Sequence, residues 1–340
     1  MRTLVRLLSF LVLLGLVYLG WVILGPGTDF SQKTKSLYVH TGKADREAVM
    51  DTLSAGGYIA HPALFDWAAS VMGVWDNLKP GRYQIIQDGS LLHLLRALKN
   101  GHQTPIRLVI NKVRTKESLA AVLGNFFECD STRVIGYMNN PDSMKVYGLD
   151  TDDALCALIP NTYLINWNAT PSQLFHRFFS VRRAFWTAAR TEAARNLGLT
   201  PDQVYILASI VEEETNKDSD KPLIASVYLN RMAKGMPLAA DPTVKFALRE
   251  FELKRIYDQY TKVASPYNTY QNKGLPPGPI CTPSVKTLDA VLSAPKTDYL
   301  FFVAKPDFSG YSNFSDNFAD HERNAKAYQQ ALDSLQKQGR

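Results

Sequence analysis

The amino terminus contains an uninterrupted uncharged stretch, Leu7–Leu24, with the sequence LLSFLVLLGLVYLGWVIL. At 1.5 Å per helical residue this stretch would span roughly 27 Å, close to the hydrocarbon thickness of a bilayer, about 30 Å. Arg2 and Arg6 precede it, and no basic residue follows until Lys33. Because positive charge marks the cytoplasmic side, we expect residues 1–6 in the cytoplasm and a transmembrane anchor over residues 7–24.

A cleaved signal peptide is the main alternative to a retained anchor. The apolar run is longer than the usual hydrophobic region of 7–15 residues, and no small-x-small cleavage site follows it. A buried core helix is the remaining alternative, which the terminal position and the Gly25–Gly27 segment disfavour. The sequence therefore predicts a single-pass protein of the inner (cytoplasmic) membrane, with residues 25–340 outside the cytoplasm.

The composition is that of folded domains. The chain has 340 residues, of which 46% are hydrophobic and 21% charged, enough for about two domains. A net charge of +6 without a Lys/Arg block argues against a nucleic-acid binder. Three cysteines, Cys129, Cys156 and Cys281, cannot form a closed disulfide framework, although a Cys129–Cys156 bridge stays open. With neither CxxC nor HExxH present, we expect no metal and no cofactor.

The region 34–165 follows a linker at 25–33 and mixes short strands with helices. Expected strands are Ser36–His40, Gly81–Ile86 and Ile106–Ile110, and expected helices are Arg46–Ala55, Pro62–Met72, Leu91–Lys99 and Lys116–Gly124. The order strand, turn, helix occurs twice, which predicts one or two small α+β modules. No acid, base and nucleophile cluster there, so a binding or spacer role is favoured.

The region 166–340 is predicted to be mainly helical, giving an α+β chain overall. Thr170 and Thr200 each precede Pro and stand three residues before Gln, which is the pattern of a capping box with Pro at N1. Expected helices run from Pro171 to about Asn196, from Pro201 to about Thr215, and from Pro222 to Lys234. A long irregular segment, 265–283, contains several prolines, and such loops in compact domains are usually functional.

The second of these helices ends in three consecutive carboxylates, Glu212, Glu213 and Glu214. The helix is apolar nearly all round, which predicts burial. At 100° per residue the three side chains point in different directions, so at least one must enter the protein or a cleft. Burial raises the pKa of a carboxyl group, as a general acid requires, whereas a solvated helix end is the plainer alternative. Glu214 continues the line of Leu207 and Ile210.

The segments that follow suit a polymer-binding groove. Asp241 follows the third helix, and the loop contains Tyr267, Asn268 and Tyr270 before a Pro-stiffened glycine segment. Aromatic rings cover sugar faces, while amides bind hydroxyl and N-acetyl groups. These residues are therefore candidates for substrate binding.

Several segments together carry a family resemblance. In chain order they are Ala208-Ser-Ile-Val-Glu-Glu-Glu-Thr215, Ala225-Ser-Val-Tyr-Leu-Asn-Arg231, Gly235-Met236, Asp241-Pro-Thr-Val244, Ser265-Pro-Tyr-Asn-Thr-Tyr270 and Gly274-Leu-Pro-Pro-Gly-Pro-Ile280. The chain resembles, over essentially its whole length, the YceG-like family of endolytic murein transglycosylases. The resemblance implies a LysM-like region at 34–165 and a catalytic domain at 166–340.

The resemblance also implies site residues. The family's catalytic Glu lies in the pattern Ala-Ser-Ile-(Val/Ile)-Glu-x-Glu-Thr, which aligns with Glu214, with Glu212 as the fallback. The family often has Phe-Pro-Asp-Thr-Tyr where this chain has Ile159-Pro-Asn-Thr-Tyr163, so Asn161 cannot take an acidic role. Cys281, which stands where the family pattern differs, is expected to be structural.

The implied activity is a lytic transglycosylase that cleaves the bond between N-acetylmuramic acid and N-acetylglucosamine in nascent glycan strands. It would leave 1,6-anhydro ends, end strand elongation and need no metal. Expected partners are peptidoglycan strands, the inner membrane and a peptidoglycan synthase. Two alternatives stay open: a hydrolase with Asp241 as second carboxylate, and a non-catalytic wall-binding scaffold.

Overall fold

The computed structural model describes residues 2–253 and 255–337, and the chain forms two compact units. The first comprises the chain up to Leu108 together with Phe126–Cys129 and Leu164–Thr170. The second comprises Val109–Asn125, Asp130–Tyr163 and the chain from Pro171 onward. The sequence analysis divides the chain once, between residues 165 and 166. In the structure most of 109–163 instead packs with the C-terminal half, in the second unit. Both are mainly helical with small two-stranded sheets.

The first unit has a short antiparallel sheet with helices between and after its strands. Its elements are α1 (Arg2–Leu24), β1 (Thr34–Val39), α2 (Arg46–Ala55), α3 (Pro62–Val71), the 3-10 helix η1 (Trp75–Asn77), β2 (Gly81–Ile86) and α4 (Leu91–Asn100). Strand β1 pairs with β2 so that Leu37 lies opposite Tyr83, and both side chains are fully buried. The predicted strands and helices of this region are confirmed to within two residues.

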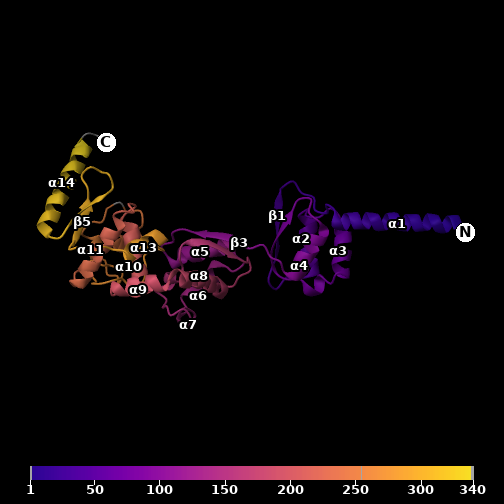
Figure 1. Ribbon diagram of the computed structural model, residues 1–340, viewed down its shortest axis with the longest axis horizontal. Helices are drawn as coiled ribbons and strands as arrows, with labels where there is room; N and C mark the ends of the chain where they lie inside the picture. Colours follow the sequence, from indigo (N-terminus) through magenta and orange to yellow (C-terminus); the bar gives the residue numbers. More distant parts are fainter. Residues whose placement is uncertain (1, 254, 338–340) are drawn as a thin grey trace. The chain divides into compact units, whose positions relative to one another are not determined.

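Helix α1 is long and apolar enough to cross a membrane. Its candidate span, Leu4–Leu24, has a mean hydropathy of 2.6, and most of its described side chains are exposed. The last turn behaves differently, because Val22 is buried in the hydrophobic core of the first unit. Figure 1 shows α1 leading directly into this unit.

The residues predicted as a linker, 25–33, belong to the packed unit. The backbone N–H of Gly27 donates to the carbonyl of Gly89 at 2.9 Å. Thr28 is buried, and its hydroxyl donates to the carbonyl of Ile86 at 2.7 Å. The turn after β2 thus ties the end of α1 to the sheet, and 25–33 is not a free spacer.

The remaining elements follow β3 (Ile106–Ile110), which pairs with β4 (Asn161–Ile165) in a second sheet. They are α5 (Lys116–Phe126), α6 (Ser131–Met138), α7 (Pro141–Lys145), η2 (Ala154–Ala157), α8 (Pro171–Phe185), α9 (Ala188–Asn196), α10 (Pro201–Glu214), α11 (Lys221–Ala233), α12 (Asp241–Leu248), η3 (Tyr260–Lys262), α13 (Val285–Leu292), β5 (Phe301–Ala304), β6 (Ser312–Ser315) and α14 (Phe318–Lys337). Strands β5 and β6 form an antiparallel hairpin.

The predicted single helix from Pro171 to about Asn196 is wrong in one respect. It is two helices, because α8 ends at Phe185 and α9 begins at Ala188. Thr187 between them takes extended backbone, and its hydroxyl accepts from the N–H of Arg190. The side chain of Thr187 satisfies a backbone N–H in the first turn of α9, which stabilises a new helix start at this point. The helix therefore divides here, although the sequence pattern is continuous.

Helix α10 is the centre of the second unit. Every residue from Val204 to Val211 is buried, as the all-round apolar pattern predicts. The predicted capping box is confirmed at Thr200 and Gln203, where each side chain bonds the other residue's backbone N–H. Helices α11, α12 and α13 pack against α10, and Figure 1 shows α11 and α13 beside it.

Cys156 and Cys281 are fully buried side chains. No disulfide joins Cys129 to Cys156 among the residues that the structure describes. The Sγ of Cys281 lies 3.4 Å from the carbonyl of Ser209 on α10, consistent with the expected structural role.

Candidate active site

Glu212 joins α10 to the start of α13. Its Oε2 accepts from the hydroxyls of Ser284, at 3.0 Å, and Thr287, and Lys221 lies 3.4 Å away. Ser284 is the N-cap of α13, so the carboxylate also lies near the positive end of that helix dipole. These donors hold Glu212 between two helices, which is a structural position and weakens it as the fallback acid.

Glu213 sits in a cationic cluster. Its carboxylate oxygens lie 3.0 Å from the Nζ of Lys112 and 3.0 Å from a guanidinium nitrogen of Arg114. Burial alone would raise the pKa of Glu213, but the hydrogen bonds from Arg114 and Lys112 bring it below the usual value. Glu213 is therefore held ionised. Glu213→Gln would leave Lys112 and Arg114 without their shared carboxylate.

Glu214 differs from both neighbours. It is partly buried, and its Oε1 accepts a 2.5 Å hydrogen bond from the hydroxyl of Tyr228. Its pKa is raised to about 7, chiefly by burial; the Tyr228 hydrogen bond lowers the pKa in part, and the negative charge of Asp241 contributes to the rise. The raised pKa predicted from the sequence is confirmed, and near neutral pH this group can both give and take a proton.

Three further groups surround Glu214. Tyr228 is buried on α11, and burial raises the pKa of its hydroxyl well above the usual value, so it stays a proton donor to the carboxylate. Arg231, one turn later, donates to the carbonyls of Leu300 at 2.7 Å and Leu238 at 2.6 Å. Lys245 on α12 lies close enough for its charge to lower the pKa of Glu214.

Asp241 and Tyr270 meet beside this group. The hydroxyl of Tyr270 donates to Oδ1 of Asp241 at 2.6 Å. Asp241 is the first residue of α12, and its exposed carboxylate faces solvent. Burial and the bonded carboxylate both raise the pKa of Tyr270, whose hydroxyl also feels the charge of Glu214. The structure thus brings together Glu214, Asp241 and Tyr270 from three separate sequence segments.

The side chains of Asn268 and Tyr267 make their contacts elsewhere than at Glu214. Asn268 is fully buried; its Nδ2 donates to the carbonyls of Thr261 at 3.0 Å and Val263 at 2.8 Å, and its Oδ1 accepts from the N–H of Tyr270. Its amide is therefore used within the loop rather than presented to a glycan. Tyr267 is half-buried, and its ring packs on Phe246 at 4.7 Å.

The Pro-rich loop is fastened to α10. The hydroxyl of Ser209, fully buried, accepts from the N–H of Ile280 at 3.0 Å. Gly278 approaches the chain so closely that a Cβ there would lie 2.1 Å from the carbonyl oxygen of Asp152. The irregular segment is confirmed, and these contacts hold it on the helix that presents the carboxylates.

Sequence reasoning missed Tyr228, Arg231 and Lys245. Tyr228 and Arg231 lie in the motif Ala225–Arg231, three residues apart on one helical face, which was a usable signal. Their direction toward Glu214 depends on how α11 packs against α10, which a single sequence does not specify.

A family model described as the YceG-like family matches residues 37–327, which include the three glutamates and every residue around them. The chain belongs to the YceG-like family. The endolytic murein transglycosylase of Bacillus subtilis is 33% identical over 172 residues, covering 50% of this chain and 47% of that protein. Those of two Streptococcus pneumoniae strains, D39 and R6, are 28% identical over 355 positions, covering 93% of this chain and 64% of theirs. The chain therefore spans about half to two thirds of the length of these relatives.

A solved structure gives the same family. The crystal structure of a YceG-like protein from Listeria monocytogenes superposes with a TM-score of 0.57 at 26% sequence identity. The match covers 86% of this chain and 99% of that one.

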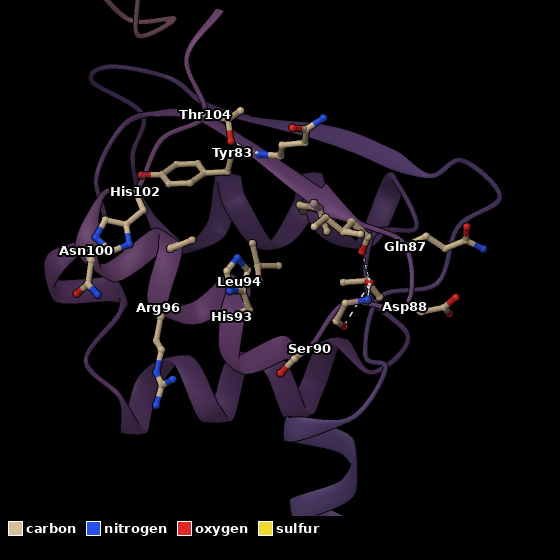
Figure 2. Close-up of a pocket in the computed structure, with 16 residues that line it drawn as sticks. Tyr83, Gln87, Asp88, Ser90, His93, Leu94, Arg96, Asn100, His102 and Thr104 are labelled. Carbon is tan, nitrogen blue, oxygen red and sulfur yellow. Dashed lines mark hydrogen bonds between the residues drawn. The ribbon is translucent and has the colours of Figure 1, made fainter.

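Each of the two units of this YceG-like chain contains a cavity. One, of about 140 Å³, lies beside Glu213, and its lining residues are Arg114, Glu213, Pro242, Lys245, Phe246, Phe251 and Ile280. The other, of about 460 Å³, lies in the first unit between β2 and α4 (Figure 2). The larger cavity has one carboxylate on its lining, Asp88. In the described residues, no cluster of three or more His, Cys, Asp or Glu side chains could hold a metal ion.

Proposed function

We propose that this chain is a membrane-anchored endolytic peptidoglycan lytic transglycosylase with Glu214 as its acid and base. The names of the relatives support the reaction class. The observation that carries the assignment to Glu214 is its carboxyl group with a pKa of about 7, oriented by Tyr228 at the end of a buried helix. Glu212 and Glu213 are engaged with other parts of the protein.

The reaction would proceed without water. Protonated Glu214 gives its proton to the glycosidic oxygen between N-acetylmuramic acid and N-acetylglucosamine, and the bond to C1 breaks through an oxocarbenium-like state. The carboxylate then takes the proton of the muramic 6-hydroxyl as that oxygen attacks C1. The products are a 1,6-anhydro end and a free 4-hydroxyl, and Glu214 is protonated again. Asp241 would stabilise the positive charge on the ring.

A hydrolase is the second candidate, favoured by one observation: Asp241 is a second carboxylate close enough to raise the pKa of Glu214. Mass spectrometry of digested glycan strands separates the two. Anhydro ends in the absence of added reducing ends support the transglycosylase, whereas reducing ends alone would make Asp241 a partner in hydrolysis.

The first unit is proposed to be a LysM-like glycan-binding module. In support, two α-helices and a short 3-10 helix lie between its antiparallel strands, and the cavity of Figure 2 is lined by apolar residues such as Leu94 together with polar side chains such as His93 and Asn100 on α4. A peptidoglycan synthase partner stays a prediction from the family resemblance.

We expect α1 to be a retained anchor. Its apolar surface is exposed over most of its length, and Arg2 and Arg6 precede the uncharged stretch 7–24, as the positive-inside rule requires for a cytoplasmic amino terminus. The full-length protein should stay with membranes after high-salt and alkaline washing. A mature soluble form beginning near Gly27 would show that the segment is a signal peptide.

The pH dependence of kcat/KM should follow the protonation of Glu214. Because the acid form starts the reaction, kcat/KM should fall as pH rises through about 7. Asp241→Asn removes a charge that raises this pKa, so the alkaline limb should move to lower pH by about 0.3–1 unit. Lys245→Met removes a charge that lowers it, so the limb should move to higher pH. If neither variant changes the pH at which kcat/KM falls, Glu214 is not the acid that titrates there.

A further inference from the structure

The first unit begins to pack before the apolar helix α1 ends. The side chain of Val22, in the last turn of α1, is 1% exposed and belongs to the hydrophobic core of this unit. The hydroxyl of Ser90, the N-cap of α4, donates to the carbonyl of Ile23 at 2.9 Å. Together with the hydrogen bonds of Gly27 and Thr28, these contacts leave no free spacer between α1 and the unit.

The length of α1 then limits how far the unit can stand from a bilayer. Without its last turn, the uncharged stretch covers residues 7–21, which span about 22 Å as a helix. That is less than the hydrocarbon thickness of about 30 Å, and a short span is accommodated by thinning of the bilayer or by flanking residues that reach the interface. If α1 crosses the membrane as proposed, the near end of the first unit therefore lies among the lipid head groups.

Helix α3 lies at this near end. The backbone N–H of Ala60, two residues before α3, donates to the carbonyl of Gly27 at 3.1 Å. Helix α2 packs on β1 and α4 packs on β2, while α3 packs on these two helices. Figure 1 shows α3 at the edge of the unit where α1 ends, and β1 toward the opposite edge.

The outer face of α3 is apolar. Its buried, core-facing side chains are Phe65, Ala68 and Ala69. At 100° per residue, Ala63, Trp67 and Val71 form a stripe on the other side of the helix. Trp67 is 50% and Val71 68% exposed. Trp is enriched at membrane–water interfaces, and a helix that lies in the interface buries its apolar face there.

The charges on and beside α3 agree with a lipid surface. Its one acidic residue, Asp66, accepts a hydrogen bond from the guanidinium of Arg46 on α2 at 2.8 Å, so this carboxylate is paired. The ammonium of Lys99 on α4 donates to the carbonyl of Met72, the residue after α3, at 2.8 Å. A cation therefore lies at the end of the helix, where anionic head groups would attract it.

We propose that Ala63, Trp67 and Val71 form a membrane seat, a stripe that inserts into the boundary between the head groups and acyl chains of the extracytoplasmic leaflet. The occupant is the lipid bilayer, and the proposal rests on the proposed anchor. A single spanning helix can tilt and rotate, and interfacial Trp residues fix both. The seat gives the first unit a second attachment and so sets which of its sides faces the cell wall.

The test uses the full-length protein in vesicles of phosphatidylethanolamine and phosphatidylglycerol. A bimane label is attached in turn to Val71→Cys, Gln84→Cys and Val17→Cys, and the native cysteines, which are buried, do not compete. Lipids with a nitroxide at a shallow or a deep acyl position quench labels that reach the bilayer and report their depth. Gln84 is the control, exposed on the outer face of the sheet, and Val17 reports on α1 itself.

The Val71 label should be quenched at about 5–10 Å into the head-group and acyl boundary, the usual depth of an interfacial apolar face, and the Gln84 label should not be quenched. Trp67→Ser should lower the quenching at Val71. Tyr257→Ser, which removes an exposed ring in the second unit, should leave it unchanged.

Equal quenching of the Val71 and Gln84 labels would overturn the seat. So would a Val71 label that is shielded from water without being quenched by lipid, because a protein partner on the stripe gives that result. The Val17 label decides the anchor separately. If Val17 is quenched and Val71 is not, the anchor stands and the seat is wrong; if Val71 is quenched and Val17 is not, the stripe binds the bilayer and the anchor is wrong.

Discussion

Replacing Glu214 with Gln should lower the release of anhydro-muropeptides by about 10²–10⁴-fold, the usual contribution of general acid–base catalysis. Gln keeps the size of the side chain and can still accept the Tyr228 hydrogen bond, but it cannot exchange a proton. The protein should stay folded and still bind glycan. Release measured by mass spectrometry, with binding measured in parallel, checks the prediction.

The neighbouring glutamates are the controls. Glu212→Gln weakens the contact between α10 and α13 and leaves Lys221 with a poorer partner, so stability should fall more than the chemistry. Glu213→Gln should destabilise the Lys112 and Arg114 cluster and lower turnover only modestly. If Glu212→Gln abolishes release while Glu214→Gln does not, the acid is two residues earlier. If none of the three matters, the catalytic assignment of α10 is wrong.

The same Glu214→Gln variant should be more stable than wild type at alkaline pH. The folded pKa of about 7 lies above the ordinary value of 4.5, so the folded state holds a proton over this range and the unfolded state does not. The free energy of unfolding therefore decreases as pH rises from about 4.5 to 7 and stays lower above it. Gln removes that loss, which is about 3 kcal/mol for pKa values of about 7 and 4.5 at 1.36 kcal/mol per pKa unit. Thermal melting at pH 8 and pH 4 should show the gain at pH 8 only.

Local signals in the sequence predicted α10 closely. The capping box at Thr200 and Gln203 marked its start, and the all-round apolar pattern predicted the burial of Val204–Val211. Three carboxylates on successive helical residues cannot all share one environment. In the structure Glu212, Glu213 and Glu214 indeed have different partners. These features depend on helix geometry and on residues near in sequence, so one sequence suffices to read them.

The partners of those carboxylates could not be read in the same way. Lys112 and Arg114 reach Glu213 from about 100 residues earlier, and Ser284 reaches Glu212 from about 70 residues later. Such contacts depend on the packing of helices and loops. The same reason explains why Asn268, a plausible sugar-binding amide by composition, is instead a buried support for the loop.

Asn268→Asp should destabilise the protein more than Asn272→Asp, a change of the same kind in the same loop. The change is isosteric, but it replaces the two N–H donors with an oxygen facing the carbonyls of Thr261 and Val263. A fully buried site cannot hydrate that oxygen or the two carbonyls that lose their donors. The expected loss is roughly 3 kcal/mol or more. Thermal melting measures it, and limited proteolysis within 263–284 should show the loop opening first, since its irregular backbone depends on these bonds.

Asn272→Asp is the control, because it removes the same two amide N–H donors at an exposed position. The Nδ2 of Asn272 also donates to two backbone carbonyls, those of Ser265 at 2.9 Å and Asn268 at 3.0 Å, but its side chain is exposed. Water can replace both bonds there, so the expected loss is about 1 kcal/mol or less. Turnover should follow the loop: Asn268→Asp should lower anhydro-end formation, since Tyr270 depends on this turn to reach Asp241, and Asn272→Asp should leave it near wild type. Equal stability of the two variants would mean that Asn268 does not hold the loop, and the amide would again be a candidate for direct contact with the glycan.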